Sequence, residues 1–261
     1  MHYVRTGSGT PPLVFVHGFA CSSDDWGLQT KELKNQFEIV ACDLRGHGQT
    51  PGRPQECTIE NFGGDVAALV SVLQLEKPIL IGHSMGCRVV LEAARVAPER
   101  VGGLVLIDGS RTGWGDPAAD EAAARAAVEK SGYPAFAENL FRQMFFAPSA
   151  LADAIVSRAL KQSIGFGPLL WPAMARWDAA TMDAALASVR VPVLVIQSTT
   201  RNAALKRTML KAGESSPYLD LLRKGLEHVR IEVVPEVGHF TMLEAPERVN
   251  RLISGFAASP S

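Results

Sequence analysis

Six short runs of apolar, often β-branched residues are spread along the chain, and they limit the fold more than any other feature. They lie at residues 13–16, 38–41, 78–81, 101–107, 191–196 and 229–234. Each run is bounded by Gly, Pro or polar residues, which is typical of strands buried on both faces of a parallel sheet. Helical patterns separate the runs, at residues 26–33, 59–73, 87–97, 217–226 and 246–256. This alternation predicts an α/β fold with a mostly parallel, doubly wound sheet.

The alternation stops between residues 113 and 188, where an alanine-rich sequence favours helices at 118–130, 135–146, 151–162 and 178–188. This region is either ordinary helical core or a cap (lid) over a site at the carboxyl ends of the strands, where open α/β sheets bind ligands. We expect residues 1–112 and 189–261 to form the core and residues 113–188 to form an inserted helical cap. Its substrate-binding residues are expected to be Phe141, Phe145, Trp171 and Trp177.

Charge and cysteine content exclude several classes of protein. The 261 residues carry 26 basic and 27 acidic side chains, a formal net charge of −1, which favours neither nucleic acid nor an anionic membrane as partner. No apolar run reaches transmembrane length. The cysteines are Cys21, Cys42, Cys57 and Cys87, without metal-type pairing and too few for a disulfide scaffold. We expect free thiols in a cytoplasmic protein, with Cys57 on the surface.

The sequence GHSMG at residues 82–86 lies between an apolar run and a helical pattern. Gly-x-Ser-x-Gly in a strand–turn–helix context is typical of a nucleophilic serine on a sharp turn, here Ser84. The amide of Met85 would then lie at a helix N-terminus and could donate to developing negative charge. The alternative is a glycine-flanked turn in which Ser84 only caps the helix.

A second donor is expected from His17-Gly18-Phe19, which follows the first apolar run. The Gly18 position lets the loop turn close to Ser84, so the backbone amide of Phe19 would complete an oxyanion hole with Met85. For the side chain of His17 we favour a packed residue that holds this loop.

Five segments together resemble the α/β-hydrolase superfamily over almost the whole chain. They are HGF at 17–19, DLRGHGQT at 43–50, GHSMG at 82–86, LVLIDGS at 104–110 and VGHFTMLEAPERV at 237–249. The resemblance implies that Asp43, Arg45 and His47 shape a structural loop. It also places the general base at His239, in a turn near the C-terminus, and an imidazole suits proton transfer near neutral pH.

The acid of the triad is where this sequence departs from most of the superfamily. An Asp is expected after the 191–196 run, but Gln197-Ser198-Thr199-Thr200-Arg201-Asn202 follows, and a long basic loop spanning 199–215 comes next. Some α/β-hydrolases carry the acid one strand earlier, which here gives Asp108 and the order Ser84, Asp108, His239. Asp220, at the start of the 217–226 helix, stays open as the alternative.

These residues predict a serine hydrolase that cleaves esters or lactones through an acyl-serine intermediate. The apolar cap favours a small-molecule substrate with an alkyl or aryl body, such as an acylated homoserine lactone. No metal or organic cofactor is required. Two alternatives remain: carbon–carbon bond hydrolysis or cofactor-free oxygenation on the same fold, and a small-ligand receptor with little turnover.

Overall fold

A seven-stranded sheet runs through the computed structural model, which describes residues 1–202 and 206–259. The strand order is β1-β3-β2-β4-β5-β6-β9, with β1 antiparallel to β3 and the other neighbours parallel. The strands are β1 (Tyr3–Thr6), β2 (Leu13–Val16), β3 (Ile39–Cys42), β4 (Ile79–His83), β5 (Gly103–Ile107), β6 (Val193–Gln197) and β9 (Val229–Val233). The predicted fold class is therefore confirmed.

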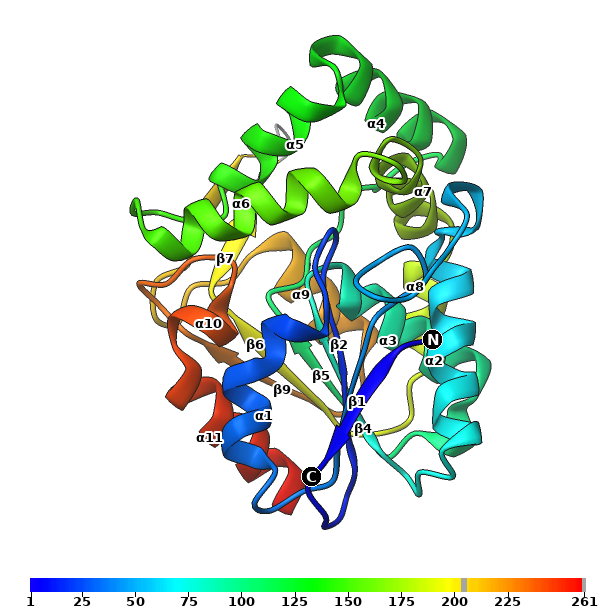
Figure 1. Cartoon of the computed structure of the whole chain (residues 1–261), viewed down its shortest axis with the longest axis vertical. Coiled ribbons are helices and arrows are strands. Elements are labelled where there is room, and N and C mark those ends of the chain that lie inside the picture. The colour runs from blue at the N-terminus through cyan, green and yellow to red at the C-terminus, as the bar shows by residue number, and fades with distance from the viewer. Residues whose placement is uncertain (203–205, 260–261) are drawn as a thin grey trace.

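Helices cover both faces of the sheet (Figure 1). On one face lie α1 (Gly27–Leu33) and α11 (Pro246–Ala258), and on the other α2 (Ile59–Val72), α3 (Met85–Val96), α8 (Met182–Ser188) and α9 (Pro217–Gly225). Every residue of β2, β3, β4, β5 and β6 is buried, which explains why these strands have nearly continuous apolar sequences. Short helices complete this part: η1 (Ser23–Trp26), η2 (Pro54–Glu56), η3 (Pro98–Arg100) and α10 (Thr241–Glu244).

Four helices between β5 and β6 form the upper part of the molecule in Figure 1, above the sheet. They are α4 (Pro117–Ser131), α5 (Tyr133–Arg142), α6 (Ala150–Ser163) and α7 (Gly167–Ala180). The helix predicted at 135–146 ends earlier, at Arg142. The helix predicted at 178–188 is divided at Thr181 between the end of α7 and α8. Residues 178–180 of that predicted helix continue α7 instead. The side chains of Trp171, Trp177 and neighbouring apolar residues of α7 are buried.

The predicted basic loop contains a hairpin, formed by β7 (Thr199–Arg201) and β8 (Arg207–Met209). Thr199 is paired with Met209 and Arg201 with Arg207. Residues 203–205 of that loop lie outside the described residues.

Cys57 corrects one expectation, because it is buried rather than exposed. Its thiol lies 3.5 Å from the carbonyl oxygens of Arg45 and Arg53, so a polar local sequence folds over it. The four cysteines are all free and buried. Among the helices of the described residues, none has the length and apolar character needed to cross a membrane.

Candidate active site

Ser84 occupies a strained turn between β4 and α3. Its backbone has φ 55° and ψ −112°, a region that non-glycine residues rarely adopt. A side chain at Gly82 would collide with the Gly86 carbonyl, and one at Gly86 would collide with the Val16 carbonyl, so both flanking glycines are required sterically. Ser84 makes no side-chain cap bond to α3, which argues against the capping alternative.

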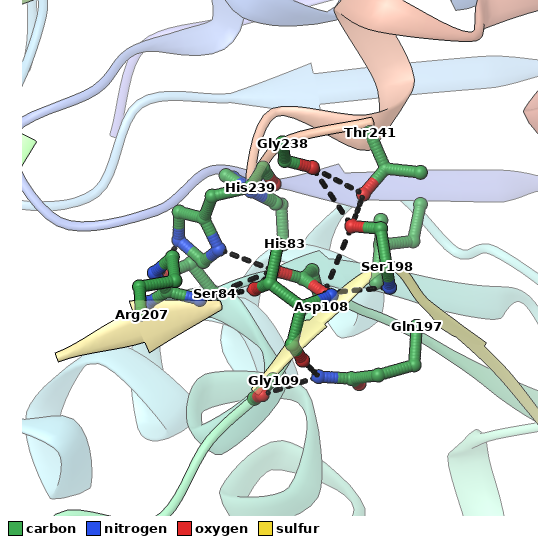
Figure 2. Close-up of polar contacts among 12 residues, drawn as sticks. His83, Ser84, Asp108, Gly109, Gln197, Ser198, Arg207, Gly238, His239 and Thr241 are labelled. Atoms are coloured by element: carbon green, nitrogen blue, oxygen red, sulfur yellow. Dashed lines mark hydrogen bonds and ion pairs between the residues drawn. The ribbon is translucent and has the colours of Figure 1, made fainter. Parts of the chain in front are cut away.

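The Ser84 hydroxyl instead faces His239, which comes from the turn before α10 (Figure 2). Ser84 Oγ lies 2.8 Å from His239 Nε2, and His239 Nδ1 lies 2.6 Å from Asp108 Oδ2. Asp108 follows β5 directly and is fully buried. Asp220, the alternative acid, is exposed on α9 and bonds Ser215 and Arg223, so it does not reach His239.

The segment after β6, which lacks an acid, supplies donors to Asp108. The backbone N–H groups of Ser198 and Thr199 donate to Asp108 Oδ1 at 2.8 and 2.7 Å. Thr199 Oγ1 donates to Oδ2 at 2.5 Å and accepts from Arg207 Nη1 at 2.5 Å. The Ser198 hydroxyl also donates to the Gly238 carbonyl at 2.8 Å, which links this support to the turn that carries His239.

Burial and charge set the protonation of this group. Burial, followed by the guanidinium groups of Arg207, Arg201 and Arg88, holds the pKa of His239 well below its usual 6.5. Burial raises the pKa of Asp108, and Arg207 with the donors on Thr199 and Ser198 opposes that rise. The imidazole is therefore neutral near pH 7, which is the form that can accept the Ser84 proton.

Two further histidines, His83 and His17, form hydrogen bonds from their rings to backbone groups near the site. His83 Nε2 donates to the carbonyl of His239 at 2.9 Å, and the two rings lie 4.7 Å apart, a support that the sequence analysis missed. Its place in the GHSMG motif, directly before Ser84, was the only available signal. His17 Nε2 accepts from the Leu44 N–H at 3.0 Å, so its Nδ1–H donates to the Gly18 carbonyl at 2.8 Å. His17 holds the loop, as predicted.

The DLRGHGQT segment lies beside this loop and builds a turn around Asp43. The Asp43 carboxylate accepts from the N–H groups of Ser23 and Gln49 at 2.8 Å each. Arg45 is paired with Asp65 at 2.6 Å, and His47 is buried 4.2 Å from the ring of Phe166. These contacts are structural, as the resemblance implied.

A narrow cavity of about 20 Å³ opens at Ser84, enclosed by side chains of α5, α7 and the β7–β8 hairpin. Its lining residues are Phe19, Ser84, Met85, Arg88, Ser110, Thr112, Leu140, Met144, Trp171, Met174, Arg201 and Arg207. Larger hollows of about 590 Å³ lie elsewhere, between α1 and α11 and beside β8, but neither contains Ser84, His239 or Asp108. The small cavity is therefore the candidate site on chemical grounds.

The residues expected in the oxyanion hole and the cap differ in their placement. Phe19 and Met85 line the cavity with Ser84, and within the described residues their amides donate to no other group. Trp171 also lines it. The other three predicted substrate-binding residues do not. Phe141 stacks on Phe19 at 6.2 Å, Phe145 stacks on Phe240 at 5.2 Å, and the fully buried Trp177 donates to Glu92 at 3.3 Å.

Among the described residues, no group of three or more His, Cys, Asp or Glu side chains could hold a metal ion.

A mostly parallel sheet, a serine on a strained turn and a contacting histidine define the α/β-hydrolase class. Residues 13–252 match the Alpha/beta hydrolase family, and the chain belongs to that family. It is 30% identical over 266 residues to a dihydrolipoyllysine-residue acetyltransferase component of an acetoin cleaving system from Pseudomonas putida. That match covers 96% of this chain but 64% of the relative, so the chain spans less than two thirds of that protein.

Two other similar proteins are matched over most of their length. The chain is 27% identical over 257 residues to 3-oxoadipate enol-lactonase 1 from Acinetobacter baylyi, which covers 95% of this chain and 89% of the relative. A malate-bound structure of a thermophilic esterase from Thermogutta terrifontis has a TM-score of 0.78 and 27% identity, covering 98% and 92% of the two chains. By their names these two similar proteins are a lactonase and an esterase.

Proposed function

We propose that this protein hydrolyses carboxylic esters or lactones through an acyl intermediate on Ser84. One observation carries the proposal: a serine held at φ 55° whose oxygen lies 2.8 Å from His239, itself 2.6 Å from a buried carboxylate. This is the arrangement that acyl transfer requires of a nucleophile, a base and an orienting acid. The enol-lactonase and esterase relatives are consistent with it.

The reaction follows from the geometry. Ser84 Oγ attacks the carbonyl carbon while His239 Nε2 takes its proton, and Asp108 stabilises the resulting imidazolium. The amides of Phe19 and Met85 donate to the oxyanion, which can contribute about 3 kcal/mol per donor. His239 then protonates the leaving alcohol, and it next takes a proton from the water that attacks the acyl carbon. The products are the acid, the alcohol and free Ser84.

Helices α4 to α7 act in this proposal as the cap predicted within residues 113–188, over the core formed by residues 1–112 and 189–261, whereas α8, the last helix of that segment, covers the sheet beside α3. Leu140 and Met144, at and just after the end of α5, close the cavity together with Trp171 and Met174 of α7. A cavity of about 20 Å³ holds little more than one water molecule, so substrate entry requires these side chains to move. Their apolar character favours an acyl or aryl body next to the reacting carbonyl.

The test compares Ser84→Ala with Ser110→Ala, which removes a second hydroxyl from the same cavity. On nitrophenyl esters and lactones of several chain lengths, we expect Ser84→Ala to lose at least about 10³-fold in kcat, and Ser110→Ala to lose far less. A fluorophosphonate should lose fluoride to Ser84, so that the peptide containing Ser84 gains the mass of the phosphonyl group.

Other outcomes would identify the alternatives. Ester turnover that survives in Ser84→Ala excludes the acyl-serine mechanism. Oxygen consumption with an aromatic substrate would indicate an oxygenase, and tight binding of a small ligand without any turnover would indicate a receptor.

A further inference from the structure

Three arginines line the cavity at Ser84, and two of them have carboxylate partners. Arg88 forms a two-pronged ion pair with buried Asp178, with both distances 2.7 Å. Arg207 lies 3.2 Å from Asp108 Oδ2. Asp178 also accepts from the Thr112 N–H at 2.6 Å, so its oxygens are already engaged.

Arg201 is the third arginine at the cavity, and among the described residues its guanidinium has no carboxylate partner. Its Nε and Nη2 atoms are buried and form no hydrogen bond within the described residues. Arg201 lies on β7 opposite Arg207 of β8, which places a second cation beside it. On another side Arg201 Cζ lies 5.4 Å from the centre of the Trp171 ring, which holds the guanidinium by a cation–π contact.

An unpartnered cation in such a place costs free energy in the free protein. Buried donors without acceptors cost about 1–3 kcal/mol, and more when they are charged. Burial and the neighbouring Arg207 and Arg88 lower the pKa of Arg201 to about 9, so it still carries its charge at neutral pH. Among the residues that the structure describes, Arg88, Arg201 and Arg207 face two carboxylates around this cavity, Asp108 and Asp178, which leaves one positive charge unbalanced.

We propose that Arg201 binds a carboxylate of the substrate, so that the preferred substrate is an ester or lactone carrying a second, ionised acid group. A guanidinium presents parallel N–H donors that match a carboxylate, and the free Nε and Nη2 are such a pair. The reacting carbonyl does not need Arg201, because the amides of Phe19 and Met85 serve its oxyanion. This inference rests on the proposed function and names its substrate class.

The kinetic test uses two esters of equal shape and different charge. Monomethyl glutarate carries a free carboxylate, and the methyl ester of glutaric half-amide carries a neutral amide in its place. We expect wild-type protein to prefer the acid by about 10- to 100-fold in kcat/KM, because a site built for an ionic contact rejects a substrate that lacks it. Arg201→Gln should bring that ratio close to one, mainly through KM for the acid, and Arg201→Lys should restore part of it.

Arg223→Gln is the matched control, since it removes one arginine charge from the exposed pair with Asp220 and should keep the wild-type ratio. The melting temperature separates binding from structure: Arg201→Gln should melt no lower than wild type, because it removes a buried charge without a partner. A preference ratio near one in wild-type protein, or an equal loss on both esters in Arg201→Gln, would overturn the inference.

Calorimetry with glutarate separates this inference from the proposed function, because it needs no turnover. Glutarate should bind Ser84→Ala and should bind the double variant Ser84→Ala, Arg201→Gln at least about tenfold more weakly. If no ester is hydrolysed but this difference is found, the hydrolase proposal fails and the anion site stands. Equal binding to both variants, or none to either, rejects the anion site.

Discussion

Arg207 Nη1 lies 3.2 Å from Asp108 Oδ2, the same oxygen that lies 2.6 Å from His239 Nδ1. A guanidinium therefore shares the carboxylate that orients the imidazole. Arg207 is therefore a buried cation near the proposed base. Through its charge it should have a measurable influence on the protonation of His239.

Replacing Arg207 by Met should shift the acid limb of the pH profile. Arg207 lowers the pKa of His239, and the neutral imidazole is the active base, so removing the cation lets His239 take up a proton at higher pH. The midpoint of the acid limb of kcat/KM should rise by on the order of one pH unit. Arg223→Met should leave it in place. An unchanged or lower midpoint would contradict this electrostatic role.

Asp108→Asn should lower kcat by about 10³- to 10⁴-fold, because the amide cannot stabilise the imidazolium and favours the wrong tautomer. Steady-state kinetics and circular dichroism measure the effect and the fold. Asp220→Asn provides the comparison, and near-normal turnover in Asp108→Asn would show that the proposed triad needs no acid at this position.

Thr199→Val keeps the shape of the side chain but removes the hydroxyl that lies 2.5 Å from both Asp108 Oδ2 and Arg207 Nη1. Hydrogen bonds to charged groups contribute about 1.5–3 kcal/mol, so kcat/KM should fall by about 10- to 100-fold. Thr200→Val, one residue along the same strand, is the control. If both variants behave alike, the hydroxyl does not position the carboxylate.

Buried histidines should make the protein sensitive to acid. Burial lowers the pKa of both His47 and His83 to about 3, so between pH 6.5 and about 3 only the unfolded state is protonated, and stability is lost as pH falls. At pH 5 each contributes a loss of about 2 kcal/mol. Urea unfolding of His47→Phe should therefore show about 2 kcal/mol less loss between pH 7 and pH 5 than wild type. His228→Phe, at an exposed position, should lose as much as wild type does.

The buried strands could be predicted from sequence because each is apolar along its whole length. β1 could not, since Tyr3–Thr6 lies at the edge of the sheet, is mostly exposed and carries no apolar run. The β7–β8 hairpin escaped prediction for a different reason. Apart from Met209 its strand residues are polar, and Thr199 and Arg207 are buried because they contact Asp108, which lies about 90 residues away in the chain.

In the candidate site, too, some residues could be predicted from the sequence and others could not. Ser84 and His239 follow from local motifs, whereas the sequence left Asp108 and Asp220 as alternative acids. The structure brings the side chains of Ser84, His239 and Asp108 into contact. The sequence does not indicate whether the aromatic side chains of the inserted helices point toward the cavity or toward the core. Trp177 turns to Glu92 within the core, whereas Trp171 faces the cavity. The direction of a side chain on a helix depends on which elements pack against that helix. This depends on the tertiary structure and cannot be read from the local sequence.

Strands β4 and β5 are paired so that His83 lies opposite Ile107, and the Ser84 N–H donates to the Ile107 carbonyl at 2.9 Å. Ser84 and Asp108 each follow one of these paired residues, so two partners of the proposed triad are mounted on a single rigid frame. His239 alone rides on a turn. The β4–β5 pairing therefore sets where the backbones of Ser84 and Asp108 lie relative to each other, whereas the position of His239 depends on the contacts of its turn.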